Sequence, residues 1–215
     1  MLNKHVPISY TDDYKRNAKF IYRYGITLND YNNLFAKQNG CCAICNKHQI
    51  EFKQNLSLDH CHKTNNIRGL LCKNCNSGLG KFKDSCSLLN EAKSYLENSF
   101  TKKVNFIPKR YLNKKEYSLA KKENIRAKLL WLDYKISLSD YNTLLQIQNN
   151  CCAICNTNNN FFIKRLNSHK LLSVDHCHTT KNIRGLLCDN CNSGLGLFKD
   201  SLTNFINAIN YISNA

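Results

Sequence analysis

The residues best suited to chemistry in this sequence are cysteines that recur as Cys-x-x-Cys pairs. There are four such pairs: Cys42 with Cys45, Cys72 with Cys75, Cys152 with Cys155, and Cys188 with Cys191. Two pairs brought together offer four thiolates, which bind Zn²⁺ tetrahedrally and leave no position for water. We therefore predict two structural zinc ions, one for each group of four cysteines. Cys41 and Cys151 are alternative first ligands, but they would lengthen the spacer to three residues.

A second set of candidate residues lies between and just after these pairs. It consists of Asp59, His60, His62 and Asn76, and it recurs as Asp175, His176, His178 and Asn192. Carboxylate and amide oxygens suit a cation such as Mg²⁺, which keeps some waters and takes phosphate oxygens from a substrate. A neutral histidine nearby can take a proton from water as that water attacks phosphorus. The set favours phosphodiester hydrolysis, and its alternatives are a further zinc site or polar packing.

A duplication explains why both sets of residues occur twice. Residues 59–85 and 175–201 are identical at 23 of 27 positions, and the differences avoid every candidate ligand. Because neither copy has lost a candidate catalytic residue, we expect both sites to be active. The pattern predicts a first domain over residues 10–97, a basic linker over 98–125 and a second domain over 126–215.

Short helices and hairpins must hold these residues in place. Thr27 and Ser137 are typical helix N-caps, each followed three residues later by an Asp. Partly alternating apolar segments predict strands and their hairpin partners. The predicted strands are 52–58 with 67–71 in the first copy, and 171–174 with 183–187 in the second. With a helix from Cys72 onward, the fold class is α+β: two tandem zinc-stabilised ββα domains flanked by helices.

Three further expectations concern local geometry. A regular strand would place Asp59 and His60 on opposite faces, so the strand must end or twist at this point. The second copy has six extra residues between Asn156 and its Asp-His cluster, and we assign them to a loop. The apolar stripes of the last helix in each copy are predicted to be core. They comprise Leu88, Leu89, Ala92, Tyr95 and Leu96, and then Phe205, Ile206, Ile209 and Ile212.

The charge of the chain points to a polyanionic partner. The formal net charge is +16, and residues 98–130 hold ten Lys or Arg against two Glu. Such an excess serves nucleic acid or an anionic membrane surface. The candidate metal sites, and the lack of bulky apolar residues on a basic amphipathic face, favour nucleic acid. The alternative is a solvated linker that only keeps the chain soluble.

The cellular compartment of the protein decides whether its cysteines are expected to form disulfides or to bind zinc. The first residues contain no apolar run of signal-peptide length, and no stretch of 18 apolar residues occurs. We therefore expect an intracellular protein that is neither secreted nor bound to a membrane. In a reducing compartment, paired Cys-x-x-Cys motifs predict zinc ligands instead of disulfides.

These motifs resemble the recombination endonuclease VII group of the His-Me finger, or HNH-like, nucleases. The shared pattern is Cys-Ala-Ile-Cys, then Leu- or Val-Asp-His-Cys-His, then Ile-Arg-Gly-Leu-Leu-Cys-x-x-Cys-Asn with a later Leu-Gly and Asp. It spans 43 residues in the first copy and 49 in the second. The resemblance implies a metal-dependent DNA endonuclease. The phage archetype of this group resolves branched DNA as an intertwined homodimer.

The resemblance also implies roles for individual residues. Asp59 and Asn76 would hold magnesium, His60 would be the general base, and His62 would support the site or contact the phosphate. The same roles would fall on Asp175, Asn192, His176 and His178. The chain departs from the group in two ways. Cys61 or Cys177 stands between the histidines where the archetype has an acidic residue, and the finger occurs twice, which predicts a monomeric, covalent pseudo-dimer.

Several alternatives stay open at the level of sequence. A non-catalytic zinc module that binds nucleic acid would need only the cysteines and the charge. A homing or restriction-type nuclease would share the chemistry and differ in substrate. Arg68 and Arg184 would either contact phosphates or pair with a local acid. Cys61, Cys86 and Cys177 have no assigned role.

Overall fold

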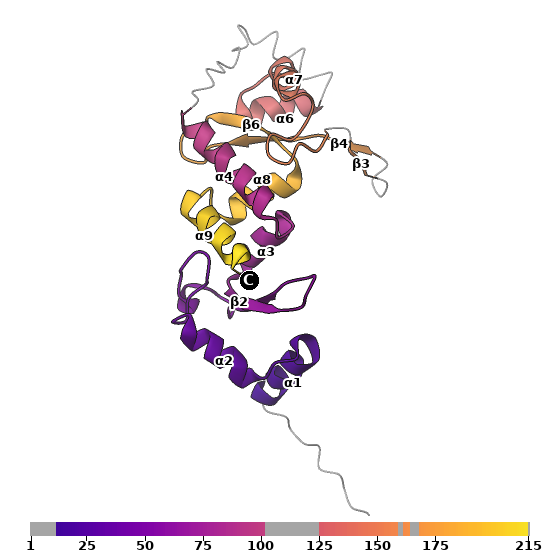
Figure 1. The fold of residues 1–215 in the computed structure, drawn as a ribbon. Coiled ribbons are helices and arrows are strands. Elements are labelled where there is room, and N and C mark those ends of the chain that lie inside the picture. Colours follow the sequence, from indigo (N-terminus) through magenta and orange to yellow (C-terminus); the bar gives the residue numbers. More distant parts are fainter. Residues whose placement is uncertain (1–11, 102–124, 159–160, 164–167, 215) are drawn as a thin grey trace, which may run out of the picture. The chain divides into compact units, whose positions relative to one another are not determined.

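A computed structural model describes residues 12–101, 125–158, 161–163 and 168–214 (Figure 1). The chain divides into two compact units. One contains the described residues up to Asn76 together with those from Asn210 onward, and the other runs from Ser77 to Ile209. The domain limits expected from the repeat, at 10–97 and 126–215, stay predictions. Most of the expected linker, 98–125, lies outside the described residues.

The first repeat begins with two helices and continues into a hairpin and two further helices. The elements are α1 (Asp12–Tyr24), α2 (Leu28–Lys37), the 3-10 helix η1 (Gln49–Glu51), β1 (Ser57–His60), β2 (Ile67–Leu71), α3 (Lys73–Lys81) and α4 (Cys86–Thr101). A capping box starts α2, as expected: the Thr27 side chain accepts from the Asp30 N–H at 3.2 Å, and Asp30 accepts from the Thr27 N–H at 2.8 Å.

The second repeat has the same order of helices and hairpin, with a second hairpin where the first repeat has η1. Its elements are α6 (Ile125–Tyr134), α7 (Leu138–Ile147), β3 (Phe161–Ile163), β4 (Ser168–Lys170), β5 (Ser173–His176), β6 (Ile183–Leu187), α8 (Asp189–Leu197) and α9 (Leu202–Ser213). Ser137 and Asp140 form the second capping box. The expected loop before the first strand was wrong in part, because β3 and β4 pair there as an antiparallel hairpin.

The hairpins β1–β2 and β5–β6 confirm the expected strand, strand, helix order, and the class is α+β. Their first strands differ from the expected bounds. In β1 the strand starts at Ser57, because Ser57 pairs with Leu71 and the chain then turns into α3. No residue of β2 is left to pair with 52–56. In β5 the strand runs from Ser173 to His176, two residues further along the chain than expected.

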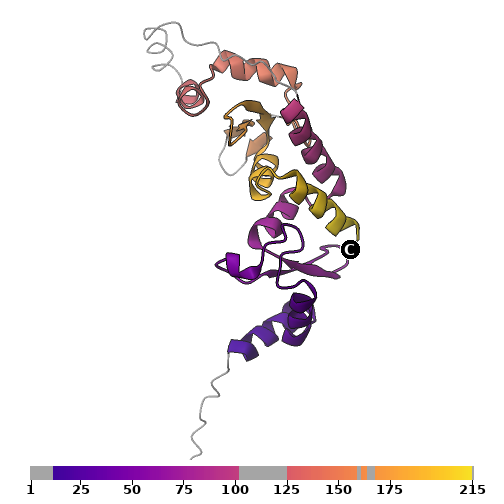
Figure 2. The same ribbon diagram turned by 90° about the vertical axis from the view of Figure 1, so that its left-hand side faces the viewer.

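A cluster of phenylalanines forms the core of the unit from Ser77 to Ile209. The Phe198 ring centroid lies 6.2 Å from that of Phe82 and 4.9 Å from that of Phe205, and all three rings are fully buried. A Cβ at Gly194 would lie 2.5 Å from Cε2 of Phe82, so a glycine is needed there. Figures 1 and 2 show α8 and α9 close together. Leu89, Ala92 and Leu96 of α4 are buried as well, which confirms part of the expected core stripe.

Candidate functional site

The eight predicted zinc ligands gather into two clusters. In each cluster the four sulfur atoms lie within 4.8 Å of one another. The Cys45 and Cys72 sulfurs are 3.9 Å apart, and those of Cys155 and Cys188 are 3.6 Å apart. A tetrahedral site with Zn–S bonds of about 2.3 Å requires sulfurs about 3.8 Å apart. Each cluster therefore fits one structural zinc ion, and Cys42 and Cys152, not their neighbours Cys41 and Cys151, belong to the clusters.

The sulfur atoms of each cluster influence one another's protonation. Hydrogen bonds from Cys45, Cys72 and Cys75 lower the pKa of Cys42 far below its ordinary value, and bonds from Cys188 and Cys191 lower that of Cys152. The same contacts raise the pKa of Cys75. In each cluster the pKa of the first cysteine is therefore lowered and that of the last is raised. Zinc replaces the remaining protons on binding, which is why its affinity for such sites depends on pH.

A β-bulge places the candidate catalytic residues in each hairpin. Asp59 pairs with Gly69 but His60 pairs with Ile67, so Arg68 is an extra residue on β2. The second hairpin repeats this, with Arg184 between Ile183 and Gly185. A bulge bends its strand and turns a side chain to a new direction. The expectation that the strand must end or twist at this point is confirmed, because the register shifts between Asp59 and His60 and β1 ends at His60.

The bulged arginines pair with the candidate metal-binding aspartates. Nε of Arg68 donates to Oδ2 of Asp59 at 2.7 Å, and Nη2 donates to Oδ1 at 3.0 Å. In the second repeat both distances from Arg184 to Asp175 are 2.7 Å. The side chains in both pairs are at most 5% exposed. Of the two alternatives for these arginines, pairing with a local acid is the one that the structure shows.

Removing the arginine is expected to destabilise the fold. Arg68→Leu leaves the buried Asp59 carboxylate without its cation, which costs about 3–5 kcal/mol of unfolding free energy. The matched control is Arg16→Leu, because Arg16 pairs with Asp13 at 3.8 Å with both side chains exposed, and exposed pairs contribute at most about 1 kcal/mol. Urea unfolding measures both. Equal losses in the two variants would contradict a structural role for the buried pair.

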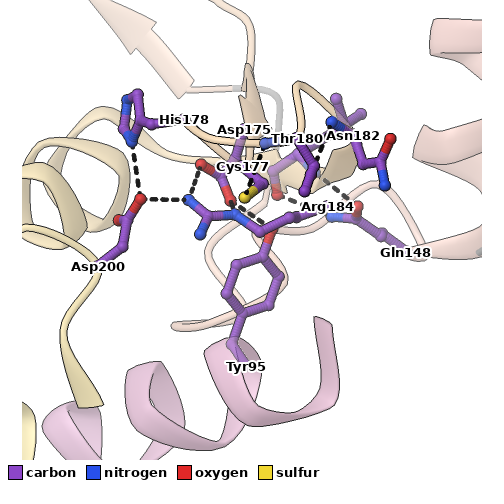
Figure 3. A network of polar contacts seen from close by, with 10 residues as sticks. Tyr95, Gln148, Asp175, Cys177, His178, Thr180, Asn182, Arg184 and Asp200 are labelled. Atoms are coloured by element: carbon purple, nitrogen blue, oxygen red, sulfur yellow. Dashed lines mark hydrogen bonds and ion pairs between the residues drawn. The ribbon is translucent and has the colours of Figure 1, made fainter. Parts of the chain in front are cut away.

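A tyrosine makes the third contact to each aspartate. The Tyr211 hydroxyl donates to Oδ2 of Asp59 at 3.0 Å, and the Tyr95 hydroxyl donates to Oδ2 of Asp175 at 2.8 Å. Burial and the neighbouring carboxylate raise the pKa of both phenols well above its ordinary value, so each stays protonated. Figure 3 shows Tyr95 pointing from α4 toward Asp175 and Arg184. The sequence places Tyr95 in a core stripe and does not single out Tyr211.

The histidines lie beside these aspartates on the same hairpins. The ring centroids of His60 and His62 are 4.9 Å apart, and those of His176 and His178 are 5.2 Å apart. Tyr24 at the end of α1 and Tyr134 at the end of α6 meet His60 and His176 edge-on, at 5.4 and 5.6 Å. These two tyrosines carry no motif that would single them out in the sequence.

The two histidines of the second repeat differ in their surroundings. Burial lowers the pKa of His176, and the charge of His178 lowers it further. At a given pH a larger fraction of this imidazole is therefore neutral and able to accept a proton. His178 is 66% exposed, and its Nδ1 lies 2.8 Å from Oδ2 of Asp200. Asp200 also accepts from Nη2 of Arg184 at 3.2 Å, so it joins His178 to the Arg184–Asp175 pair (Figure 3).

The candidate asparagines sit in the helix that follows each hairpin. The backbone N–H of Asn76 donates to the Cys72 carbonyl at 3.0 Å, and that of Asn192 to the Cys188 carbonyl at 2.9 Å. Each asparagine is thereby fixed to a zinc-binding segment. In the second repeat, α8 packs against both β5 and β6, the hairpin that carries Asp175 and His176. Within the part of the chain described, neither side-chain amide makes a hydrogen bond, so its oxygen is available to a ligand.

A glutamine that the sequence does not point out ties each hairpin to the preceding helix. Gln38 Nε2 donates to the carbonyls of Cys41 and Leu70 at 2.8 and 2.9 Å, and its Oε1 accepts from the Leu70 N–H at 2.8 Å. Gln148 makes the same contacts with Cys151 and Leu186. Each glutamine thus connects a zinc-binding turn to the strand that carries the arginine. A lone Gln at a helix end has no sequence signal for this role.

The remaining cysteines lie outside both clusters. Hydrogen bonds from Thr64 and Thr180 lower the pKa of Cys61 and Cys177, which stand between the histidines. The Cys41 sulfur donates to the Asn39 carbonyl at 3.4 Å, and the Cys86 sulfur lies 4.0 Å from the Ile209 carbonyl oxygen. Cys151 lies next to its cluster without joining it. None of these thiols completes a metal site among the described residues.

Two regions of the chain are similar to one known protein family. The family described as recombination endonuclease VII matches residues 17–98 and 127–214. The Gene 59 protein of Mycobacterium phage L5 is 40% identical over 82 residues, which is 38% of this chain and 49% of that protein. The Gene 59 protein of Mycobacterium phage D29 is 40% identical over 80 residues, 37% of this chain and 48% of that protein. The chain thus spans about half the length of these relatives, and no solved structure matches it.

One structural finding bears on the expected compartment. Among the residues that the structure describes, no helix is long and apolar enough to cross a membrane.

Proposed function

Because the chain belongs to the recombination endonuclease VII family and carries the family's repeat twice, we propose that it is a metal-dependent DNA endonuclease. It hydrolyses phosphodiester bonds and acts on branched or recombination-intermediate DNA. The observation that carries this proposal is the repetition of one site. In both repeats an Asp-His-x-His segment lies at a register shift of its hairpin, and an Asn directly follows the last cysteine of a four-cysteine cluster. A module that only binds nucleic acid would need no such set.

The donors around each aspartate fit one bound magnesium ion. A carboxylate offers about four lone-pair positions. Among the described residues, the arginine and tyrosine donors take two positions on Oδ2 and one on Oδ1. One position on Oδ1 stays available to a cation, and the free amide oxygen of Asn76 is a second hard ligand. Asp175 and Asn192 offer the same pair in the second repeat.

The histidines supply the proton transfer of the proposed reaction. Magnesium bound by the Asp and Asn oxygens would stabilise negative charge on the phosphate and the leaving oxygen. His60 and His176 accept a proton from the attacking water, and no described residue engages their ring nitrogens in a hydrogen bond. His62 and His178 support the site or contact the phosphate. In the second repeat Asp200 orients His178 by the bond at Nδ1.

We propose that both sites are catalytically active. The single chain then carries the two active sites that a homodimer would have. The observation in favour is that the Asp–Arg pair, the bulge and the zinc cluster are formed equally well in both repeats. The basic residues of the linker and of the finger sites bind the DNA backbone, which positions a protein without selecting bases. The enzyme works in the compartment that holds its DNA. The linker itself lies mostly outside the described residues.

Incubation with defined DNA substrates tests this function. Purified protein with Mg²⁺ is expected to cut labelled four-way-junction DNA faster than nicked or linear duplex, and EDTA is expected to stop the cleavage. Tight binding to all three DNAs without any cleavage under Mg²⁺ would support a zinc-dependent binding module instead. Cleavage of linear duplex at one sequence would support a homing or restriction-type nuclease.

A further inference from the structure

The two tyrosines that contact the aspartates occupy equivalent positions in the repeats. Each stands thirty-six residues after the Asp of its own repeat, on the last helix of that repeat. Yet Tyr95 of the first repeat bonds Asp175 of the second, and Tyr211 of the second repeat bonds Asp59 of the first. Neither tyrosine bonds the aspartate of its own repeat.

We propose that Tyr95 and Tyr211 are positioning residues, each of which holds the metal-binding aspartate of the other repeat. Each nuclease site is then incomplete without a side chain from the opposite repeat. This proposal rests on the function proposed above, because it assigns the aspartates to the catalytic metal. The positioning group on each tyrosine is its hydroxyl.

The contacts around the aspartate show what the hydroxyl does. Arg68 Nε and the Tyr211 hydroxyl both donate to Oδ2 of Asp59, at 2.7 and 3.0 Å. Arg184 Nε and the Tyr95 hydroxyl donate to Oδ2 of Asp175, at 2.7 and 2.8 Å. With Oδ2 saturated, the remaining position on Oδ1 is the one left for a cation. The tyrosine therefore decides which oxygen of the aspartate meets the metal.

The glycine opposite each aspartate is an independent observation. Asp59 pairs with Gly69 and Asp175 pairs with Gly185 in the hairpins. A Cβ at Gly69 would lie 3.2 Å from the Tyr211 hydroxyl oxygen, and one at Gly185 would lie 3.1 Å from that of Tyr95. A Cβ there would crowd the hydroxyl, and it would lie still closer to Oε1 of Gln38 or Gln148, at 2.9 and 3.0 Å. Both hairpins thus leave room for a tyrosine from the opposite repeat.

The tyrosine is better suited to this role than water. Both aspartates are at most 4% exposed, so a mobile solvent molecule would be a poor substitute for a fixed donor. A hydrogen-bonded partner that orients a metal-binding carboxylate typically contributes about 10- to 100-fold in metal affinity or activity. The Arg68 pair also remains when the hydroxyl is removed, so the fold should survive the change.

A crossed set of variants tests the assignment by cleavage. In a His60→Ala chain only the second site cuts, and we expect Tyr95→Phe to lower its rate about tenfold. In a His176→Ala chain only the first site cuts, and Tyr211→Phe is expected to have the corresponding effect. Tyr22→Phe is the matched control, because it removes the same hydroxyl from a side chain that is 91% exposed. The half-saturating Mg²⁺ concentration of the affected site is expected to rise as its rate falls.

Metal binding without DNA gives a second measurement that does not depend on cleavage. Asp59→Asn leaves one intact site, and Mn²⁺ binding to that chain is followed by electron paramagnetic resonance. We expect Tyr95→Phe to weaken this binding about tenfold and Tyr22→Phe to leave it unchanged. Zinc content and the urea midpoint should stay constant, because the phenylalanine ring keeps the packing of the tyrosine.

Three results would separate the possible failures. If Tyr95→Phe impaired the first site and left the second unchanged, the crossed assignment would be wrong. If it lowered the urea midpoint but changed neither rate nor Mn²⁺ affinity, the tyrosine would only support the fold. If the unmodified chain cut no DNA but Mn²⁺ binding showed the crossed pattern, the proposed nuclease function would fail and the positioning role would stand.

Discussion

Replacement of both His60 and His176 by alanine is expected to reduce DNA cleavage by about 100- to 10,000-fold, the usual contribution of a general base. The reason is that, in the proposed reaction, each of these imidazoles takes the proton of the attacking water. His62 and His178 are more exposed and lie beside the base. Rates are measured on labelled four-way-junction DNA with Mg²⁺.

The single variants show whether both sites are used. His60→Ala or His176→Ala alone should leave one site working, so a junction is nicked once where the unmodified chain cuts two strands. His48→Ala is the control, since His48 caps the short helix at Gln49–Glu51 and lies outside the site. If His60→Ala abolished all cleavage and His176→Ala changed nothing, the two-site proposal would fail.

Loss of a single zinc ligand is expected to have the largest effect on stability. Cys42→Ala should reduce the zinc content from two ions per chain to one and unfold the hairpin of the first repeat. Structural zinc contributes about 10–16 kcal/mol of binding free energy in small zinc-dependent folds. Zinc is measured by atomic absorption after purification, and unfolding is followed in urea. Cys152→Ala should have the same effect on the second repeat.

The neighbouring cysteines provide a matched control. Cys41→Ala and Cys151→Ala change the same side chain one position earlier, where the sulfur lies outside the cluster. Both variants should keep two zinc ions and nearly unchanged stability. The ligand assignment would have to be revised if Cys41→Ala lost a zinc ion while Cys42→Ala kept both.

The zinc clusters and hairpins could be predicted because their signals are local. A Cys-x-x-Cys spacing suits one metal, a Thr or Ser with Asp three residues later suits a helix start, and the Asp-His pair requires the strand to end or twist. The structure confirms each of these at Cys42, Thr27 and Asp59. The hairpin β3–β4 was missed, because six inserted polar and apolar residues carry no strong turn signal.

The sequence by itself determined the family, the duplication and the zinc ligands. These depend on residue type and short spacing, which do not change with the way that helices pack. Only the tertiary structure decided how each aspartate is held. Tyr95 has the helical spacing of a core residue, and spacing along a helix cannot show which repeat that helix will contact. Helix packing places the hydroxyl of Tyr95 against Asp175 and that of Tyr211 against Asp59. Each site therefore includes a residue of the opposite repeat.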